Sequence, residues 1–340
     1  LYLFETRKLG AASTLLLAFA ILIGLSATES RTGFLSFVSL TTLWIIWRQK
    51  LKWILPPAAL VVFGCLYAVL FWSWPALSRL FFQAGGEGEI EIVSTSIGVR
   101  WVVWPQLIEA LLQKPWFGWG WGQVSSAHNA VASSYASGEP FTYAHNIFLD
   151  FALGFGLPLA ILSSILVIGW LTPLVRRVST LKSWYLMAMC TPVAVHSLLE
   201  FPYAYAYFLA PVMVGLGALE RENGSGRVIR LSFKLALPAY AGVVLLATWF
   251  VIEYVAIEED FRVGRFEAMR IGKTPDGYHR PQVHLLTQLD ALLYGMRIVP
   301  APGMTEEQLA LSKNVALKYP WIATLHRYAL SLALNGNEAE

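Results

Sequence analysis

The sequence predicts an all-α fold, namely a polytopic transmembrane helical bundle of about seven spans with a long external loop and a C-terminal soluble helical tail. The composition is the first reason for this prediction. Of the 340 residues, 56% are hydrophobic and only 14% are charged. Such a balance is typical of a chain that crosses a bilayer several times. We therefore expect a multi-pass membrane protein.

The length of the apolar runs is the second reason. A helix needs roughly 20 apolar residues to cross about 30 Å of hydrocarbon, and several runs are near or above that length. The seven candidates are Leu9 to Thr28, Gly33 to Trp47, Trp53 to Trp72, Asn146 to Leu171, Trp184 to Leu198, Tyr203 to Leu219 and Ser232 to Ile252. The runs that begin at Gly33 and Trp184 are short, so their ends are poorly defined.

The distribution of Lys and Arg is the third reason, because basic residues gather in cytoplasmic loops. They occur in alternate loops between the apolar runs: Arg7 and Lys8; Arg48, Lys50 and Lys52; Arg176, Arg177 and Lys182; Arg221, Arg227, Arg230 and Lys234. The other loops then lie outside the cytoplasm. We therefore predict a transmembrane region over residues 1–253, which includes an external loop at 73–145, and an external helical tail over residues 254–340.

The remaining composition limits partners and cofactors. The net charge of +3 comes from these topological anchors, and no nucleic-acid motif is present, so nucleic acid is not an expected partner. Cys65 and Cys190 lie inside apolar runs and predict neither a disulfide framework nor a metal site. The chain begins with Leu1 and no cleavable leader precedes the first span, so we expect a fragment of a longer membrane protein.

The external turn between the first two apolar runs places Arg31 beside Glu29. An arginine at the outer edge of a membrane can extend its charged end to the interface and pair with a neighbouring carboxylate. A guanidinium can also bind phosphate oxygens as a rigid fork. The residues alone leave both interpretations of Arg31 open.

The external loop contains an arginine, an amphipathic segment and a glycine–aromatic motif. Arg100 precedes WVVWPQLIEALL, residues 101–112, which we expect to form a helix at the membrane interface, with boundaries made uncertain by Pro105. The PWFGWGWG motif that follows, with Trp119 at its centre, has three glycines that would let the backbone approach a sugar or a diphosphate. An aromatic–glycine turn at a membrane surface is the alternative interpretation.

A polar loop passes directly into an apolar helix at His145 and Asn146. The first N–H groups of a helix are unpaired and carry partial positive charge, so this junction suits a phosphate-like anion. Asn146 and Asp150 share one helix face at i, i+4. From the residues alone, His145 is either catalytic or a solvated capping residue. His128 and Asn129 repeat the pair among small residues, where we expect a loop.

A second polar cluster follows the fifth apolar run, in HSLLEFPYAYAYF at 196–208. His196 and Glu200 stand at i, i+4 and can pair on one face. Pro202 lets the chain turn back into the next run, and Tyr203 follows it. Ionisable residues at a membrane edge are candidates for a functional site. An interfacial tyrosine belt with one satisfied His–Glu pair is the alternative.

Charges return beyond Glu253, and no later apolar run is long enough to span. Four segments are typical of short soluble amphipathic helices: YVAIEEDFRVGRFEAM, TPDGYHRPQVHLLTQLDALLYGMRI, TEEQLALSKNVALKY and PWIATLHRYALSLALNGNEAE. The last two together resemble a tetratricopeptide-like helical hairpin, with alanines at packing positions.

Four stretches resemble the superfamily of bacterial O-antigen ligases, Wzy polymerases and O-linked protein oligosaccharyltransferases. They are SRTGFLSF at 30–37, Arg100 followed by PWFGWGWGQ up to residue 123, AHNIFLDFALGFGLP at 144–158 and HSLLEFPYAYAYFLAP at 196–211. The order and spacing of the last two are the most specific. The fourth stretch, together with the helical tail, is most similar to the protein O-oligosaccharyltransferase branch, whose members carry further spans before the first one here.

This resemblance implies transfer of a glycan from an undecaprenyl-diphosphate carrier to a hydroxyl acceptor, the Ser or Thr of a protein, at the periplasmic face of the bacterial inner membrane. It implies no cofactor and no metal. Arg31 and Arg100 would hold the diphosphate, helped by the amide dipoles that open the fourth apolar run, and His145 would accept the hydroxyl proton. Further candidates for substrate contact are Asn146, Tyr203, Glu200, His196 and Trp119.

Three alternatives stay open. An O-antigen ligase that uses lipid A-core, or a polysaccharide polymerase, would share the chemistry and differ in its acceptor. A transporter would need polar or broken spans around a cavity at mid-membrane, whereas the polar residues here gather at the outer face. A metalloenzyme would need clustered ligands, for which His128, His145 and Asp150 are the only neighbouring set.

Overall fold

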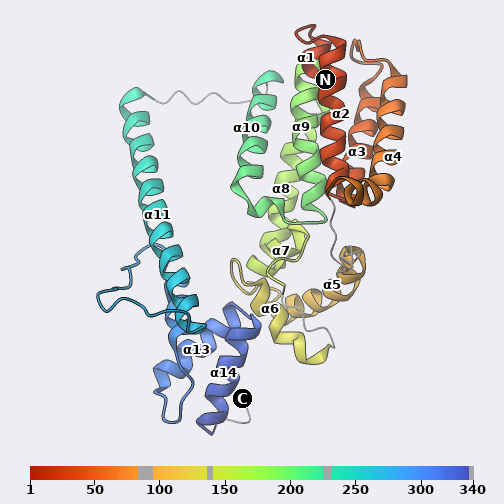
Figure 1. The fold of residues 1–340 in the computed structure, drawn as a ribbon. Helices are drawn as coiled ribbons and strands as arrows, with labels where there is room; N and C mark the ends of the chain where they lie inside the picture. Colours follow the sequence, from red (N-terminus) through yellow and green to blue (C-terminus); the bar gives the residue numbers. More distant parts are fainter. Residues whose placement is uncertain (83–94, 136–140, 225–231, 337–340) are drawn as a thin grey trace. The chain divides into compact units, whose positions relative to one another are not determined.

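A computed structural model describes residues 1–82, 95–135, 141–224 and 232–336, and within these residues the fold is entirely helical (Figure 1). The α-helices are α1 Tyr2–Glu5, α2 Ala11–Ala27, α3 Arg31–Trp47, α4 Pro57–Phe82, α5 Thr95–Gln113, α6 Val124–Val131, α7 Ile147–Phe155, α8 Leu157–Arg176, α9 Leu181–Ser197, α10 Ala206–Glu222, α11 Phe233–Ala268, α12 Thr287–Arg297, α13 Glu306–Lys318 and α14 Ile322–Leu334. Two 3₁₀ turns, η1 Ala132–Ser134 and η2 Pro202–Ala204, complete the elements. The all-α prediction is confirmed.

The helices form two compact units. One comprises Leu1–Trp121 with Tyr143–Arg227, and the other comprises Gly122–Thr142 with Val228–Glu340. The division therefore assigns a short piece of the external loop to the unit that contains the tail. Residue 253, the expected end of the transmembrane region, lies inside α11, so the apolar and charged parts of that helix are continuous.

Three of the described helices are long and apolar enough to cross a membrane, over Pro57–Leu80, Leu157–Arg176 and Phe233–Ala268. α2, α3, α9 and α10 have 17 residues each. A 17-residue α-helix is about 26 Å long, against about 30 Å of hydrocarbon. Membrane crossing by these four shorter helices, and hence a total of seven spans, stays a prediction.

The third span differs from the predicted one at both ends. α4 begins at Pro57 and continues to Phe82, so the helix extends beyond the predicted end of the span at Trp72. The start of the external loop at residue 73 stays a prediction. Pro75 lies inside this helix. A proline has no N–H, so the carbonyl of Phe71, four residues earlier, loses its helical hydrogen bond. The Ser78 hydroxyl donates to the Pro75 carbonyl at 3.1 Å, in the next turn of the helix.

The prediction of one continuous helix from Asn146 to Leu171 is also wrong. The chain breaks at Gly156, whose φ of 85° ends α7 before α8 begins. A side chain on Gly156 would collide with the carbonyl group of Trp116, so the close approach of that loop requires glycine here. α7 is thus a separate nine-residue helix that precedes the candidate span α8.

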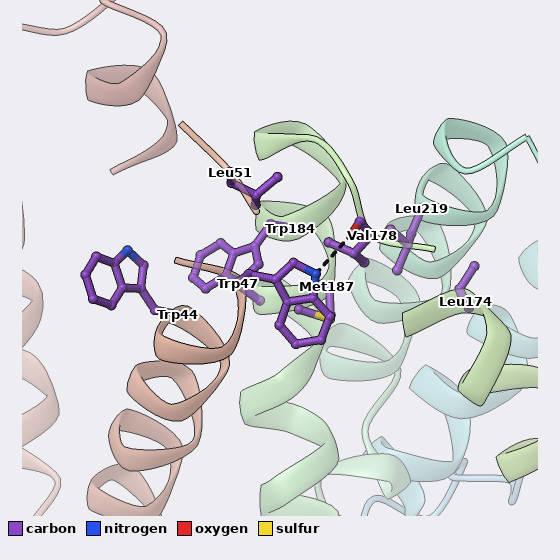
Figure 2. Packing of buried hydrophobic residues seen from close by; sticks show 9 residues of the cluster. Trp44, Trp47, Leu51, Leu174, Val178, Trp184, Met187 and Leu219 are labelled. Carbon is purple, nitrogen blue, oxygen red and sulfur yellow. Dashed lines mark hydrogen bonds between the residues drawn. The ribbon is translucent and has the colours of Figure 1, made fainter. Parts of the chain in front are cut away.

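The core of the first unit lies where α9 packs between α3 and α10. Tryptophans dominate it, and Figure 2 shows the cluster from close by: Trp44, Trp47, Leu51, Leu174, Val178, Trp184, Met187, Ala188 and Leu219. The indole N–H of Trp47 donates to the Val178 carbonyl at 3.0 Å, which satisfies the polar atom of a buried aromatic side chain. This packing fixes α9, whose far end carries Glu200 in the turn that follows.

The second unit contains α6, where a loop was predicted around His128. That prediction is wrong, because Val124, Ala127, His128 and Val131 form a buried face at i, i+3, i+4 and i+7. α6 packs against α13. The His128 ring meets Phe141 edge-on at 5.4 Å.

The tail helices pack in sequence, α11 on α12, α12 on α13 and α13 on α14. Thr305 starts α13 with a capping box to Gln308, in which each side chain satisfies a backbone N–H of the other residue. The first two predicted tail helices differ from the structure. One is the end of α11, and the other begins only at Thr287. The last two are confirmed as helices that pack together, and their tetratricopeptide character stays a prediction.

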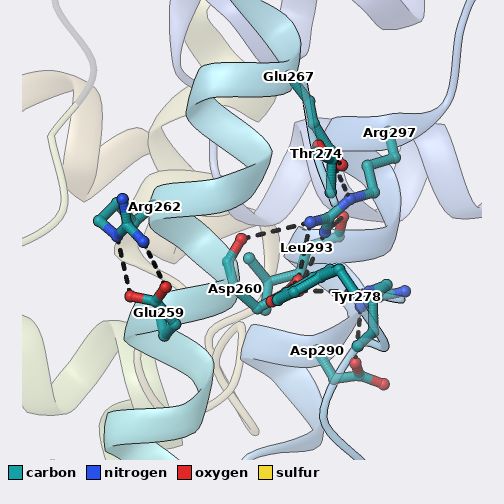
Figure 3. Close-up of polar contacts among 10 residues, drawn as sticks. Glu259, Asp260, Arg262, Glu267, Thr274, Tyr278, Asp290, Leu293 and Arg297 are labelled. Carbon is teal, nitrogen blue, oxygen red and sulfur yellow. Dashed lines mark hydrogen bonds and ion pairs between the residues drawn. The ribbon is translucent and has the colours of Figure 1, made fainter. Parts of the chain in front are cut away.

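An ion-pair network joins α11 to the rest of the tail (Figure 3). The Asp260 side chain is fully buried and accepts from Arg297 at 2.8 Å, Arg280 at 3.3 Å and the Tyr278 hydroxyl at 2.9 Å. Buried charges need such partners because their desolvation is costly. Asp260 therefore fixes the loop before α12 and the end of α12 against α11.

Replacing Asp260 by alanine is expected to destabilise the tail by about 3 kcal/mol, because two guanidinium groups lose their shared carboxylate. Limited proteolysis of the full-length protein across a denaturant series measures this loss. Glu259→Ala is the matched control, because Glu259 is exposed and pairs with Arg262 on the helix surface. A pair of that kind contributes at most about 1 kcal/mol. Equal losses for the two variants would contradict the role of Asp260.

Candidate functional site

Arg100, His145 and Glu200 converge in the first unit. One carboxylate oxygen of Glu200 accepts from the Arg100 guanidinium, and the other accepts from Nδ1–H of His145 at 2.6 Å. The three residues come from α5, from the residue before the cap of α7 and from the turn after α9. Three separate segments of the sequence, each with its own candidate, therefore meet at one carboxylate.

The contact with Glu200 selects a protonation form of His145. A carboxylate only accepts hydrogen bonds, so Nδ1 carries the proton of the neutral ring. The lone pair of the neutral imidazole is then on Nε2. The Phe201 ring meets the imidazole edge-on at 4.8 Å and stacks on Tyr143 at 4.6 Å. The hydrogen bond to Glu200 and the aromatic contact with Phe201 both help to hold the imidazole.

The charge on Glu200 depends on these neighbours. Partial burial raises the pKa of the Glu200 carboxyl, whereas the hydrogen bond from His145 and the positive charges of His145 and Arg100 lower it. The sum of these effects holds the pKa of Glu200 below its ordinary value. Glu200 is therefore ionised at neutral pH and can stabilise positive charge on the imidazole.

The backbone of His145 has a φ of 55°, in the left-handed region that is uncommon for residues other than glycine. Its neighbour Ala144 is 1% exposed. The Ala144 N–H donates to Asp150 Oδ1 at 2.7 Å, and its carbonyl accepts from the Trp104 indole at 2.8 Å. The backbone before His145 is therefore fixed by two side chains.

Asn146 caps α7 at the helix start where an anion site was predicted. Its side-chain oxygen accepts from the backbone N–H groups of Phe148 and Leu149 at 3.0 and 3.1 Å. Its amide group also donates to the Leu198 carbonyl at 3.0 Å. Two of the first N–H groups of α7 therefore already have a partner. Help from this helix start in binding the diphosphate stays a prediction.

Asp150 lies in the first turn of α7 with one carboxyl oxygen bonded to Ala144. Burial raises the pKa of Asp150 to about 6, although the Ala144 N–H and the positive charge of His145 act in the opposite direction. Its other oxygen is buried and has no hydrogen-bond partner among the described residues. A carboxyl with a pKa in this range carries a proton part of the time near neutral pH, which lessens the cost of its burial.

The remaining predicted residues fall in different surroundings. His196 lies in the last turn of α9, and its carbonyl accepts the Glu200 N–H at 2.7 Å, whereas the Glu200 carboxylate pairs with Arg100 and His145 instead. Tyr203 lies in η2, and its hydroxyl is buried without a hydrogen-bond partner among the described residues. Arg31 begins α3, but its side chain lies outside the described part of the structure.

The glycine–aromatic motif folds against the α7–α8 junction. The N–H groups of Trp119 and Gly120 donate to the carbonyls of Leu153 and Gly154 at 2.6 and 3.1 Å. Gly118 has a φ of 68°, and a Cβ there would lie 2.5 Å from the Leu153 carbonyl oxygen. Gly118 therefore allows two backbone segments to approach closely, and this packing explains that glycine without a ligand.

The rings of this motif differ in exposure. The Trp119 indole donates to the Ala110 carbonyl at 2.8 Å, and Lys114 lies 3.9 Å from its ring centroid. Trp116, Phe117 and Trp121 are instead 71%, 88% and 75% exposed. Contact between Trp119 and a substrate stays a prediction, and the structure gives this ring a packing role.

The described residues contain no group of three or more His, Cys, Asp and Glu side chains that could hold a metal ion. His128 belongs to the second unit, whereas His145 and Asp150 belong to the first.

Two families match successive parts of the chain. The family described as O-antigen ligase matches residues 16–164, and the family described as the C-terminal part of a virulence factor membrane-bound polymerase matches residues 184–340. Arg100 and His145 fall in the first match, and Glu200 falls in the second.

Two proteins of Acinetobacter baylyi are similar to the chain. Its ComP-specific O-oligosaccharyltransferase is 31% identical over 224 residues, which cover 65% of this chain and 40% of that protein. Its general O-oligosaccharyltransferase is 29% identical over 361 aligned positions, which cover 98% of this chain and 59% of that protein. The chain belongs to the superfamily of O-antigen ligases and O-oligosaccharyltransferases.

Membership in this superfamily and the apolar helices together indicate a multi-pass membrane protein. The chain spans less than two thirds of the length of either oligosaccharyltransferase. No solved structure matches it. Within the superfamily, the similarity to the two relatives supports the O-oligosaccharyltransferase branch.

Proposed function

We propose that the protein transfers a glycan from an undecaprenyl-diphosphate carrier to a hydroxyl group, the Ser or Thr of an acceptor protein, at the periplasmic face of the bacterial inner membrane. The similarity to O-oligosaccharyltransferases supports the transfer of a glycan. The single observation that carries the proposal is the shared carboxylate of Glu200, which holds His145 and Arg100 together. This arrangement supplies a base and a cation side by side.

In the proposed reaction, the acceptor hydroxyl oxygen attacks the anomeric carbon of the glycan. The bond between that carbon and the diphosphate oxygen breaks, and its electron pair leaves with the diphosphate. His145 takes the hydroxyl proton on Nε2, and the carboxylate of Glu200 stabilises the imidazolium that forms. Proton and charge are then balanced between the histidine and the leaving diphosphate.

Arg100 is proposed to hold the leaving diphosphate. A guanidinium has five N–H donors in a fixed fork, and the described structure shows only one Arg100 nitrogen bonded to Glu200. The other donors suit phosphate oxygens, on which negative charge increases as the glycan departs. Arg31 is proposed as a second cation for the same diphosphate, on the basis of the family resemblance of SRTGFLSF.

We place the external loop and the tail in the periplasm, because the basic residues occur in the alternate loops. An O-antigen ligase that uses lipid A-core, or a polysaccharide polymerase, is the second candidate function. The descriptions of the two matched families favour it. The proposed chemistry is the same in both cases, so only the acceptor separates them.

The acceptor is tested with the purified full-length protein and an undecaprenyl-diphosphate-linked glycan. We expect glycan to appear on a serine-containing acceptor protein, detected as a mass increase of one glycan unit, and not on lipid A-core offered in parallel. Transfer only to lipid A-core, or only to the end of another glycan, would replace the protein acceptor by the second candidate. Absence of transfer to all three acceptors would contradict both functions.

A further inference from the structure

We propose that Trp104 and Asp150 are positioning residues for His145, which they hold through the backbone of Ala144. The proposal rests on the function given above, because it concerns the base of that reaction. Asp150 accepts the N–H of Ala144 at 2.7 Å, and Trp104 donates to its carbonyl at 2.8 Å.

The two hydrogen bonds hold the two peptide groups on either side of the Ala144 α-carbon. They come from different elements, since Trp104 belongs to α5 and Asp150 to α7. The second peptide group contains the backbone nitrogen of His145. The peptide planes before His145 are therefore fixed from two directions, and Ala144 itself is 1% exposed.

Such a restraint is needed because His145 has a left-handed backbone. This region is unfavourable for residues other than glycine or asparagine, and such a residue stays there only where the surroundings determine the conformation. A relaxed φ would turn the Cα–Cβ bond and move the imidazole from Glu200, which it now meets at 2.6 Å. The restraint on Ala144 thus determines where the proposed base lies.

Asp150 also has a simpler possible role, because an acidic residue in the first turn stabilises a helix. The two roles predict different results. A purely helix-stabilising carboxylate would affect unfolding and would leave the rate of transfer by the folded protein unchanged. A helix-stabilising role of Asp150 would also predict no loss of activity in a Trp104 variant, because Trp104 lies on another helix and bonds the same residue, Ala144.

The experiment measures kcat and KM for glycan transfer by the full-length protein, together with its thermal unfolding. Asp150→Ala removes the acceptor for the Ala144 N–H, and we expect kcat to fall about 10²-fold while KM changes little, as for a misplaced catalytic group. Asp150→Asn keeps an amide oxygen for that N–H, so kcat is expected to stay within about three-fold of wild type. Trp104→Phe keeps an aromatic ring and loses the donor, and a fall in kcat of about ten-fold is expected.

Wild-type kcat in Asp150→Ala and Trp104→Phe would overturn the proposal, as would an Asp150→Asn variant that loses as much activity as Asp150→Ala. If Asp150→Ala does not fold, Trp104→Phe and Asp150→Asn decide the question. His145→Ala separates this proposal from the function on which it rests. If His145→Ala is inactive while Asp150→Ala and Trp104→Phe are fully active, only the positioning role is contradicted. If His145→Ala is active, both the positioning role and the proposed function of His145 as the base are contradicted.

Discussion

Replacing His145 by alanine in the full-length protein is expected to lower the rate of glycan transfer about 10³-fold, because the acceptor hydroxyl loses the base that takes its proton. His145→Asn is expected to lose as much. Asparagine tolerates the left-handed backbone better than other side chains, so this variant keeps the fold of the turn and removes only the imidazole. The measurement is the initial rate of transfer from the lipid-linked glycan.

The matched control for this loss is His279→Ala, which removes an exposed histidine of the tail. Expression and membrane insertion of all three variants should equal those of the wild type. Transfer by both His145 variants at close to the wild-type rate would show that the base has been assigned wrongly. Full activity in His279→Ala is needed before the loss in His145→Asn is ascribed to chemistry.

Replacing Glu200 by alanine is expected to lower kcat about 10²-fold, because both Arg100 and His145 lose the carboxylate that holds them. Without it, Nδ1 of His145 has no fixed acceptor, so the tautomer with the lone pair on Nε2 is no longer selected. The positive charge of Arg100 would then disfavour the imidazolium that proton transfer creates. Kinetics of transfer at saturating acceptor measure this effect on kcat.

Glu200→Gln separates charge from shape at the same position. Its amide oxygen can still accept from one neighbour, but its NH₂ group then faces the other donor, and the negative charge is lost. We expect a loss close to that of Glu200→Ala. Glu307→Gln, in an exposed position of α13, is the control and should transfer at the wild-type rate. Wild-type kcat in Glu200→Gln would refute the electrostatic role of this carboxylate.

The sequence pointed to Arg100, His145 and Glu200 as candidates, Arg100 through the family resemblance, but it did not indicate how these residues pair. His196 was the expected partner of Glu200, because it lies one helical turn away. The actual partners are 100 and 55 residues away in the sequence. Such contacts depend on how α5, α7 and α9 pack, which no short window of sequence contains.

Hydropathy predicted the all-α fold but not the break at Gly156. Apolar residues continue from α7 into α8 without a change in composition, so only the geometry of the backbone separates the two helices. α6 was missed for a different reason. Its apolar face has the helical spacing, but the helix has eight residues, and the small residues around it are typical of loops.

The role of Asp150 was missed because the sequence indicates only that it lies on the face of Asn146. Its partner, the Ala144 N–H, is a backbone group. Every residue except proline has such a group, so the sequence does not indicate which of them a side chain binds. Trp104 lies in the segment 101–112 that was expected to form an interfacial helix, and the sequence indicated no separate role for it, since its partner is the Ala144 carbonyl. Both assignments needed coordinates.

Because the helix breaks at Gly156, the number of residues in α7 determines the direction of His145 relative to α8. The nine residues of α7 lie between the left-handed turn at His145 and the break at Gly156, and each residue turns an α-helix by about 100° and advances it by about 1.5 Å. Adding or deleting one residue would therefore change the azimuth of His145 relative to α8 by more than a quarter of a revolution. Side chains along this segment can vary in kind, whereas its residue count sets the direction in which the imidazole points.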